Sequence, residues 1–561
     1  MATENTMSTM SIKSVFPKVA LKSEVQEYLH NVYTNKELVS ELGEEEAEKV
    51  FDSLLSCLSH PPALTCLRAS THTHTLQDIQ HRLEQHLAQQ QGSDCCAGRS
   101  FTPIIHHPQL PDVLLLPVRG PRDVRILDMK VVVGAQCGSA VLRGAHVFAP
   151  GVLSAPKFMK AGDIVSVFSD VEGRCTRGTK DFQGNKVFVG NGVCVMNRSD
   201  IFCAEGPVRG VAIKMDDALY QSPSFDGVLP NEVFLQNLPS VVVGHVLGPR
   251  PETVALSKRQ EVELEVAELK MLRFLLGVTR MERIRNEFIR GTAHVGHFGD
   301  KVREAQLRWF GNMQRRDMGY ISRRMLRMEP PGRRKRGRLK RRFMDVVKED
   351  MREVGLKEGV VVALDKIKSK VEKIRENADA LRLHCIKAHC YNSIQAICPD
   401  LTHSCSADAP PFPEESFDRI LLDAPCSGLG QRPNMAINYS LKEVCSYQPL
   451  QRKLFRTAVQ LMKKGGVLVY STCTVTLAEN EEQVAWALKT FPCLTLEPQE
   501  PHLGSQGMPG AELSHDQLRL LQRFRPEFSW HGATDIHGPE DLLLKANTDT
   551  IGFFIAKFMK R

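Results

Sequence analysis

Two short apolar runs constrain the fold of this chain most, because each ends in a polar motif that contains a cysteine. Arg419-Ile420-Leu421-Leu422 leads into Asp423-Ala424-Pro425-Cys426, and Val467-Leu468-Val469 leads into Tyr470-Ser471-Thr472-Cys473. Such runs are typical of buried parallel strands, and reactive groups in open α/β sheets collect just past the carboxyl ends of these strands. We therefore expect both cysteines and the aspartate to lie together at one edge of a sheet.

The chemistry of these side chains suits attack on an electron-poor ring. A thiolate can add to the ring, a carboxyl group can supply a proton, and a second thiol can help to reverse the addition. Either cysteine taken alone is more often a small buried hydrophobe than a nucleophile. The pair, with a carboxylate beside it, favours a catalytic interpretation.

The two motifs, in this order and with a helix between them, resemble the Sun-domain family of RNA cytosine-5 methyltransferases. The resemblance implies that Cys473 attacks C6 of the target cytosine and that Cys426 assists product release. It also implies that Asp423 holds N3 of the base. Downstream, Glu479-Asn480-Glu481-Glu482 is expected to open a helix, with acids near the positive end of its dipole.

Short β-segments separated by glycines occupy residues 112–203, with strands expected at 131–133, 140–142, 164–168 and 186–189. Residues 133–151 resemble the PUA domain, a small RNA-binding barrel. One family member carries such a barrel and methylates a cytosine near the acceptor end of certain tRNAs. Candidate RNA-binding residues on and near the barrel loops are Arg143, Phe148, Lys160, Arg177 and Lys180. Packing of Phe148 in the barrel core is an equally good interpretation.

The expected fold class is α/β: a Rossmann-like methyltransferase sheet with an inserted all-β PUA barrel and a small α/β N-terminal lobe. Domains are expected at 1–20 (disordered start), 21–111 (N-terminal lobe with two leading helices), 112–203 (PUA domain), 204–251 (start of the methyltransferase domain), 252–357 (basic insert) and 358–561 (remainder of the methyltransferase domain).

The part of the chain that should hold S-adenosylmethionine, the cofactor that the resemblance implies, departs from the family pattern. In the family a glycine-rich loop follows the first strand, because the backbone must approach the cofactor closely. Residues 251–357 contain neither that strand nor that loop. Asp365 resembles the ribose ligand, and Asn392 stands where the family has an aspartate near the adenine. With Asp423, these residues are the cofactor-binding candidates.

The basic excess of the chain lies in one segment. Residues 261–357 contain 25 Lys and Arg against 14 Asp and Glu, whereas the rest contains 48 against 51. Residues 291–297, 301–311 and 323–328 and the Arg/Lys run 333–342 resemble the tail of polymerases from non-LTR retrotransposons. One interpretation is nucleic-acid binding by clustered cations. A segment without a selected role is favoured, because it replaces a needed part of the fold.

Three functions remain as hypotheses: methylation of C5 of cytosine in tRNA, with mRNA as an alternative substrate; inactive tRNA binding with a destroyed cofactor site; and nucleic-acid binding by the basic segment. No apolar run long enough for a membrane span and no secretory segment are found. Sixteen cysteines then indicate a reducing compartment, so we expect a cytoplasmic protein, or a nuclear one through the basic run 333–342. We expect no metal site, since the cysteines and histidines of residues 384–405 lack zinc-ligand spacing, and no obligate protein partner.

Overall fold

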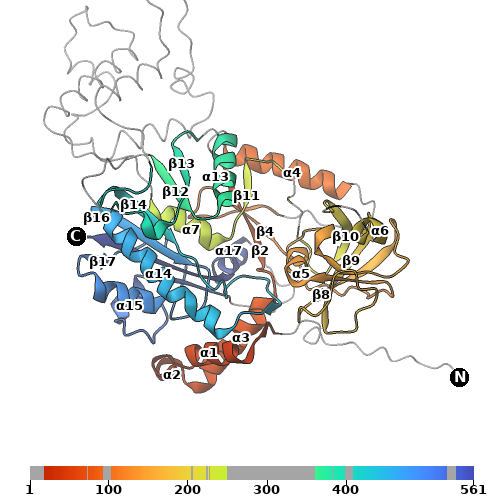
Figure 1. Cartoon of the computed structure of the whole chain (residues 1–561), viewed down its shortest axis with the longest axis horizontal. Helices are drawn as coiled ribbons and strands as arrows, with labels where there is room; N and C mark the ends of the chain where they lie inside the picture. Colours follow the sequence, from red (N-terminus) through yellow and green to blue (C-terminus); the bar gives the residue numbers. More distant parts are fainter. Residues whose placement is uncertain are drawn as a thin grey trace, which may run out of the picture. The chain divides into compact units, whose positions relative to one another are not determined.

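The computed structural model describes residues 18–71, 74–92, 103–203, 206, 208–222, 225, 228–248, 360–381, 383–398, 409–526 and 539–561. These residues fall into two compact units (Figure 1). The larger unit comprises Met1–Ala69, Ile79–Gly248 and Tyr391–Arg561, and the smaller comprises Ser70–Asp78 and Pro249–Cys390. The expected basic insert, including the run 333–342, lies outside the described residues.

The larger unit is built on a five-stranded sheet with the order β14-β16-β19-β17, in which β18 also pairs with β19. The strands are β14 (Phe417–Asp423), β16 (Met462–Thr472), β17 (Leu494–Leu496), β18 (Gln522–Pro526) and β19 (Asp549–Lys560). β14 and β16 are parallel, and Asp423 lies opposite Ser471. β19 runs antiparallel to β16, β17 and β18. The two apolar runs are thus confirmed as neighbouring parallel strands.

Alternate side chains of this sheet face two different hydrophobic cores, as the two-residue period of a strand requires. One core joins Leu468, Tyr470, Phe554, Ala556 and Phe558 to α14 (Leu441–Leu461) and α15 (Glu481–Thr490). The other joins Val467, Val469, Phe553 and Ile555 to α7 (Leu238–Leu247) and to strands of the N-terminal lobe. Figure 1 shows α14 and α15 alongside the sheet. Burial on both faces holds the strand ends in fixed positions.

The N-terminal lobe begins with three helices, where the sequence predicted two. They are α1 (Ser23–Tyr33), α2 (Lys36–Leu42) and α3 (Glu44–Ser59). The Asn35 side chain accepts hydrogen bonds from Glu37 N and Leu38 N and so starts α2, and Gly43, at φ 84°, ends it. Asn35 and Gly43 therefore bound an additional helix, α2, in the segment that connects the two predicted helices. The helices pack against Leu429 and Val475, each just beyond one of the cysteines.

A four-stranded sheet of order β11-β2-β4-β3 completes the lobe. Its strands are β2 (Leu64–Ala69), β3 (Ile105–His106), β4 (Val113–Pro117) and β11 (Val233–Leu235), and helix α4 (Leu76–Gly92) follows β2 in the chain. The short strand β1 (Ala20–Leu21) pairs with β15 (Ala436–Ile437) of the catalytic part. Outside the lobe and the barrel region, the larger unit also contains η4 (Ser393–Gln395), α16 (His515–Arg519) and α17 (Pro539–Thr548).

The barrel region forms a six-stranded sheet of order β6-β10-β9-β8-β5-β7. Its elements are β5 (Lys130–Gly134), α5 (Ala135–Leu142), β6 (Val147–Phe148), η2 (Ala149–Gly151), β7 (Val152–Ser154), β8 (Ile164–Asp170), β9 (Lys186–Cys194), α6 (Arg198–Phe202) and β10 (Val211–Ala218). Three of the four predicted strands are confirmed, but the strand predicted at 140–142 is wrong. Those residues form the last turn of α5, because a run of three apolar residues has no period that separates strand from helix. β10 extends the barrel past residue 203.

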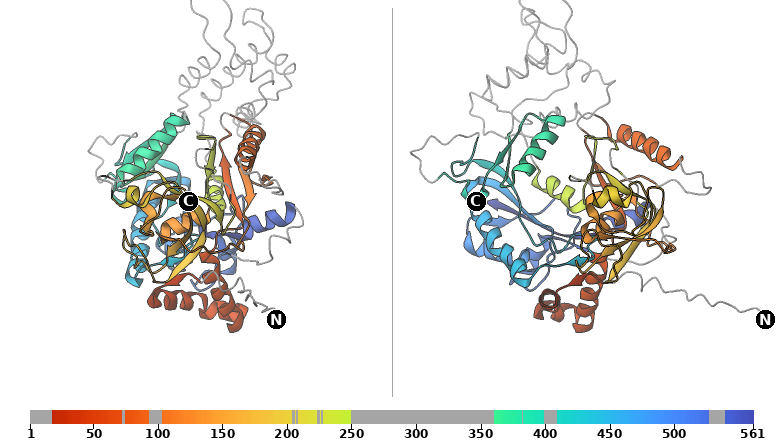
Figure 2. Two further views of the ribbon diagram at one scale, coloured as in Figure 1. Left: turned by 90° about the vertical axis from the view of Figure 1, so that its right-hand side faces the viewer. Right: turned by 45° about the vertical axis from the view of Figure 1, so that its right-hand side comes forward.

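The smaller unit contains a parallel pair, β12 (Val361–Asp365) and β13 (Ile386–Cys390), with α13 (Lys368–Ala380) packed against it (Figure 2). Within the described ranges, β12 pairs only with β13 and β14 pairs only with β16. The exposed fractions of Val361 and Leu421 are 52% and 45%. Interior strands of a parallel sheet are normally buried on both faces. The described part of the chain therefore supplies no strand beside the second edge of β14 or of β12.

Two buried guanidinium groups tie the N-terminal helices to the sheet. Arg432 donates from Nε to the carbonyls of Cys57 at 2.7 Å and His60 at 3.1 Å, and from Nη1 to Asp549. Arg523 donates from Nη1 to both carboxylate oxygens of Glu481, at 2.8 and 2.7 Å. From Nη2 it donates to the carbonyl of Val475 and to Tyr33 Oη.

No described helix is long and apolar enough to cross a membrane.

We predict that Arg523→Met lowers the free energy of unfolding by about 3–5 kcal/mol, because it leaves the buried Glu481 carboxylate without its partner. Urea unfolding followed by circular dichroism measures the change. Lys49→Met is the matched control, since the ion pair of Lys49 with Glu45 is exposed to solvent. This control should leave the unfolding midpoint unchanged. An equal loss in both variants would contradict a special role for the buried pair.

Candidate active site

The sulfur atoms of Cys426 and Cys473 meet at the carboxyl ends of β14 and β16. Their Sγ atoms are 3.3 Å apart, and Cys473 N donates to Cys426 Sγ at 3.4 Å. The parallel register brings them together, and the loop after β14 is held to β16 at two points. Ala424 N donates to the carbonyl of Ser471 at 3.1 Å, and Gly430 N donates to that of Cys473 at 3.1 Å. Both cysteine residues are partly buried.

The hydrogen bond between the two sulfurs gives the two thiols different pKa values. The hydrogen bond from Cys426 lowers the pKa of Cys473 to about 7, against the opposing effect of burial, and the Gln431 side chain lowers it further. The same hydrogen bond, together with burial, raises the pKa of Cys426 well above its usual range. Cys473 is therefore the group that ionises near neutral pH, and Cys426 keeps its proton. A thiolate beside a thiol is the arrangement that a thiol nucleophile needs.

Asp423 ends β14 on the same edge and is exposed. Its Oδ1 accepts a hydrogen bond from Ser471 Oγ at 3.1 Å, which orients the carboxylate. Its charge acts to raise the pKa of Cys473, so the two groups lie within electrostatic reach of each other. This edge of the sheet thus brings together a thiolate, a thiol that keeps its proton and a carboxylate.

A buried carboxylate that the sequence interpretation misplaced lies behind the cysteines. Glu479 was expected in the first turn of a helix, but α15 begins two residues later, at Glu481, and the exposed fraction of Glu479 is only 1%. The carboxylate accepts hydrogen bonds from Ser427 N at 2.9 Å, Gln451 Nε2 at 2.9 Å and Thr476 Oγ1 at 3.1 Å. The hydroxyl residues that surround the acid, Ser427, Thr474 and Thr476, are the sequence signal that indicates an interior position.

The cofactor candidates are engaged with their own local chain. In the smaller unit, Asp365 Oδ1 accepts from Ile367 N at 2.7 Å, and Lys370 Nζ lies 3.7 Å from Oδ2. In the larger unit, Asn392 caps η4 and accepts from Ile394 N at 3.3 Å. A carboxylate at the end of β12 has the chemistry of a ribose ligand. Neither candidate is part of a glycine-rich cradle among the described residues.

The barrel candidates differ in what they contact. Phe148 is 44% exposed, which excludes the interpretation of this ring as barrel core. Arg143, Lys160 and Lys180 are exposed on the barrel surface. The Arg177 guanidinium, in contrast, donates to the carbonyls of Ala149, Pro150, Val152 and Ile201 and so braces the barrel loops. An arginine held by four carbonyls is placed first of all to stabilise the barrel.

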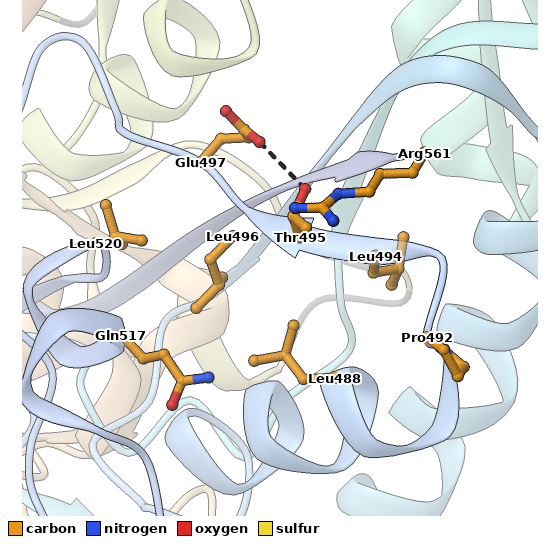
Figure 3. Close-up of a pocket in the computed structure, with 9 residues that line it drawn as sticks. All are labelled: Leu488, Pro492, Leu494, Thr495, Leu496, Glu497, Gln517, Leu520 and Arg561. Atoms are coloured by element: carbon orange, nitrogen blue, oxygen red, sulfur yellow. Dashed lines mark hydrogen bonds between the residues drawn. The ribbon is translucent and has the colours of Figure 1, made fainter.

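A pocket of about 380 Å³ lies apart from the cysteine edge, between α15, β17 and α16 (Figure 3). It is lined by Leu488, Pro492, Leu494, Thr495, Leu496, Glu497, Gln517, Leu520 and Arg561. None of the candidate residues lines it. Over the part of the chain that the structure covers, no three His, Cys, Asp or Glu side chains are grouped as metal ligands would be.

Comparison with known proteins places this geometry among RNA-modifying enzymes. Residues 349–559 match the family model described as 16S rRNA methyltransferase RsmB/F. The chain is 45% identical over 552 residues to the tRNA (cytosine(72)-C(5))-methyltransferase NSUN6 of Mus musculus, covering 97% of each chain. It is 46% identical over 553 residues to that of Homo sapiens, covering 98% of this chain and 99% of the relative.

A solved structure shows the same fold over nearly the whole chain. It is described as the crystal structure of NSun6 from Pyrococcus horikoshii with SFG, with a TM-score of 0.57 at 22% identity. The match covers 97% of this chain and 98% of the other.

We predict that iodoacetamide labels Cys473 before Cys426, at a rate that rises with pH through about 7 and then levels off. The thiolate is the reactive species, and it forms as the pH passes the lowered pKa of Cys473. Mass spectrometry of tryptic peptides between pH 5.5 and 9.5 measures both rates, with the exposed Cys445 as an internal control. Preferential labelling of Cys426 would contradict the conclusion that Cys473 ionises first while Cys426 keeps its proton.

Proposed function

This chain belongs to the Sun-domain family of RNA cytosine-5 methyltransferases, and from that premise we propose that it acts on a cytosine of tRNA through a bond between Cys473 Sγ and C6 of the base. The single observation that carries this proposal is the 3.3 Å contact between two sulfur atoms of unequal proton affinity. The two NSUN6 relatives, at 45% and 46% identity, are named as tRNA enzymes, which supports tRNA as the substrate.

Attack uses Cys473 as the nucleophile. When its thiolate bonds to C6, the C5–C6 double bond opens and its electron pair makes C5 nucleophilic. Negative charge also spreads to the N3 side of the ring. N3 can take up a proton from solvent, and the Asp423 carboxylate can then accept a hydrogen bond from N3–H. The Ser471 hydroxyl, at 3.1 Å, holds this carboxyl group in position. C5 is then the ring position at which a methyl donor, if bound, would supply its methyl group.

Release uses Cys426. The first cause of its raised pKa is the hydrogen bond to Cys473, and that cause disappears once Cys473 is bonded to carbon. Cys426 can then pass its proton to solvent and accept the C5 proton as a thiolate. The electron pair of the C5–H bond restores the double bond, and the C6–S bond breaks with the sulfur leaving as thiolate. The same contact therefore serves both steps.

S-adenosylmethionine is the methyl donor that we propose for the family reaction. The neighbouring Pyrococcus structure, determined with SFG, an analogue of that donor, supports this. The residues of this chain do not fit a complete site for it. Asp365 can contribute a carboxylate to a ribose, but Asn392 lacks a charge, and residues 251–357 contain no glycine-rich loop. This observation favours a second candidate function, a tRNA-binding protein that has lost methyl transfer.

When a methyl donor reacts at C5, we predict that Cys426→Ala accumulates a covalent protein–RNA adduct with tRNA: loss of the Cys426 hydrogen bond slows attack by Cys473, whereas loss of the base for the C5 proton blocks release. A denaturing gel with labelled tRNA should show a shifted band. Cys473→Ala should show none, and Cys445→Ala, an exposed cysteine on α14, is the control that should behave as wild type. Normal methyl transfer by Cys426→Ala without a shifted band would contradict the assignment of Cys426 to product release.

We also predict that the full chain binds S-adenosylmethionine more weakly than micromolar in isothermal titration. A charged hydrogen bond at Asp365 contributes about 1.5–3 kcal/mol, whereas micromolar binding needs about 8 kcal/mol. Replacing residues 252–357 with the family's first strand and glycine-rich loop should restore binding, and Asp365→Ala should weaken the restored site. A micromolar dissociation constant for the unaltered chain would show that its residues do form a donor site.

A further inference from the structure

The carboxylate of Glu479 lies between the two loops that carry the cysteines. Its Oε2 accepts from the backbone N–H of Ser427, the residue after Cys426, at 2.9 Å. Its Oε1 accepts from Ser427 Oγ at 2.6 Å and lies 3.5 Å from Oγ1 of Thr474, the residue after Cys473. The Ser427 and Thr474 hydroxyls are themselves 2.7 Å apart. One carboxylate thus joins the residues that directly follow both sulfurs.

Glu479 is also held by one helix, α14, and one strand, β16. Gln451 Nε2, on α14, donates to Glu479 Oε2 at 2.9 Å and to the carbonyl of Pro425 at 2.9 Å. Tyr470 Oη, on β16, donates to the Glu479 carbonyl at 2.7 Å. Every polar group around the carboxylate is a donor, which matches an acceptor-only side chain. Burial raises the pKa of Glu479, and the hydrogen bonds from Ser427, Gln451 and Thr476 oppose that rise.

We propose that Glu479 is a positioning residue that locks the Cys426 loop against the end of β16 and so holds the two sulfurs in contact. It touches neither sulfur and neither reacting atom of the base. Its effect reaches Cys473 through Ser427 and Cys426. The identity of the nucleophile rests on the proposed function, whereas the geometric effect on the two sulfurs does not.

The charge of Glu479 contributes a second effect in the same direction. After the hydrogen bond to Cys473 and burial, the Glu479 charge adds to the causes that raise the pKa of Cys426. A proton kept on Cys426 is a proton available for the hydrogen bond that favours the Cys473 thiolate. Geometry and charge can be separated, because glutamine is nearly the same shape as glutamate.

Glu479→Ala should slow alkylation of Cys473 at pH 7 by about 5–10-fold. Loss of the sulfur contact returns the pKa of Cys473 from about 7 toward the ordinary value of about 9, which reduces the thiolate fraction at pH 7 from about one half to about one hundredth. The higher intrinsic nucleophilicity of a more basic thiolate recovers about eightfold of that loss. The rise of the rate with pH should shift upward by the same change.

Glu479→Gln should keep most of the geometry. Its amide oxygen can accept from Ser427 N and Gln451, and its amide nitrogen can donate to the Ser427 and Thr476 hydroxyls, which are able to accept. We expect less than about a threefold loss in the rate at pH 7, by analogy with the small cost of a matched hydrogen bond. Glu482→Gln is the matched control, since Glu482 lies on α15 and its carboxylate bonds Gln448 instead of a cysteine loop. This control should leave the profile unchanged.

The decisive measurement is the pH profile of Cys473 alkylation in the full chain, followed by mass spectrometry beside a thermal unfolding scan. A purely structural role for Glu479 would lower the melting temperature but leave the pH midpoint in place, and that result overturns the proposal. If Glu479→Ala does not fold, Ser427→Ala removes the bridging hydroxyl alone and should raise the midpoint partway. An unchanged midpoint in a folded Ser427→Ala would then overturn it.

Alkylation needs no RNA and no methyl donor, so this test is separable from the proposed function. A shifted midpoint in Glu479→Ala, together with a wild-type chain that never forms a bond to tRNA, would refute the function but not the role of Glu479. The reverse pair of results would refute the role of Glu479 alone.

Discussion

The parallel pairing of β14 with β16 is the constraint on which the remainder of the site depends. Because Asp423 lies opposite Ser471, the chain leaves both strands at the same edge, and the two cysteines follow within three residues. Burial on both faces of the sheet fixes that register, since a slip of one residue would exchange the sides on which Leu468 and Val469 pack. The N-terminal helices pack on the loops beyond the cysteines and, through Arg432 and Arg523, are bonded to the same sheet.

The consequence for reactivity is that one proton is shared unequally between two sulfurs. An isolated buried thiol has a raised pKa and is inert, as burial makes Cys66 in the N-terminal lobe. The pKa of Cys473 is lowered instead, because the Cys426 thiol donates a hydrogen bond to its sulfur. The loop that carries Cys426 is held in place by the hydrogen bond from Ser427 N to Glu479. The thiolate form of Cys473 is thus favoured by geometry inside the protein, and no cation or helix terminus among its described neighbours is needed to account for the lowered pKa.

The sequence predicted the strands and the edge because these depend on local patterns. An apolar run followed by a polar motif identifies a buried strand end, and two such runs identified β14 and β16. Shorter or less regular patterns gave wrong predictions. Residues 140–142 are helical although a strand was predicted, and Asn35 and Gly43 divide the leading segment into three helices although two were predicted. The interior position of Glu479 could not be read from helical periodicity, because it depends on donors from Ser427 and Gln451, which are distant in sequence. Asp365 and Asn392 were found by resemblance, and each accepts a hydrogen bond from its own local chain.

These observations separate the proposed cytosine-directed chemistry, whose residues lie together in the described structure, from the supply of a methyl group, for which the described residues contain no glycine-rich cradle. The most direct measurement of the first is peptide mapping of the wild-type chain after incubation with tRNA in which 5-azacytidine replaces cytidine. That base has nitrogen in place of C5, so C6 is more electron-poor and the bond to Cys473 forms more readily. Acid quenching captures the adduct before the thiolate is expelled. The account predicts a nucleotide on the peptide that contains Cys473, formed without any methyl donor. A nucleotide on the Cys426 peptide, or no bonded nucleotide while Cys473 still reacts with iodoacetamide, would contradict it.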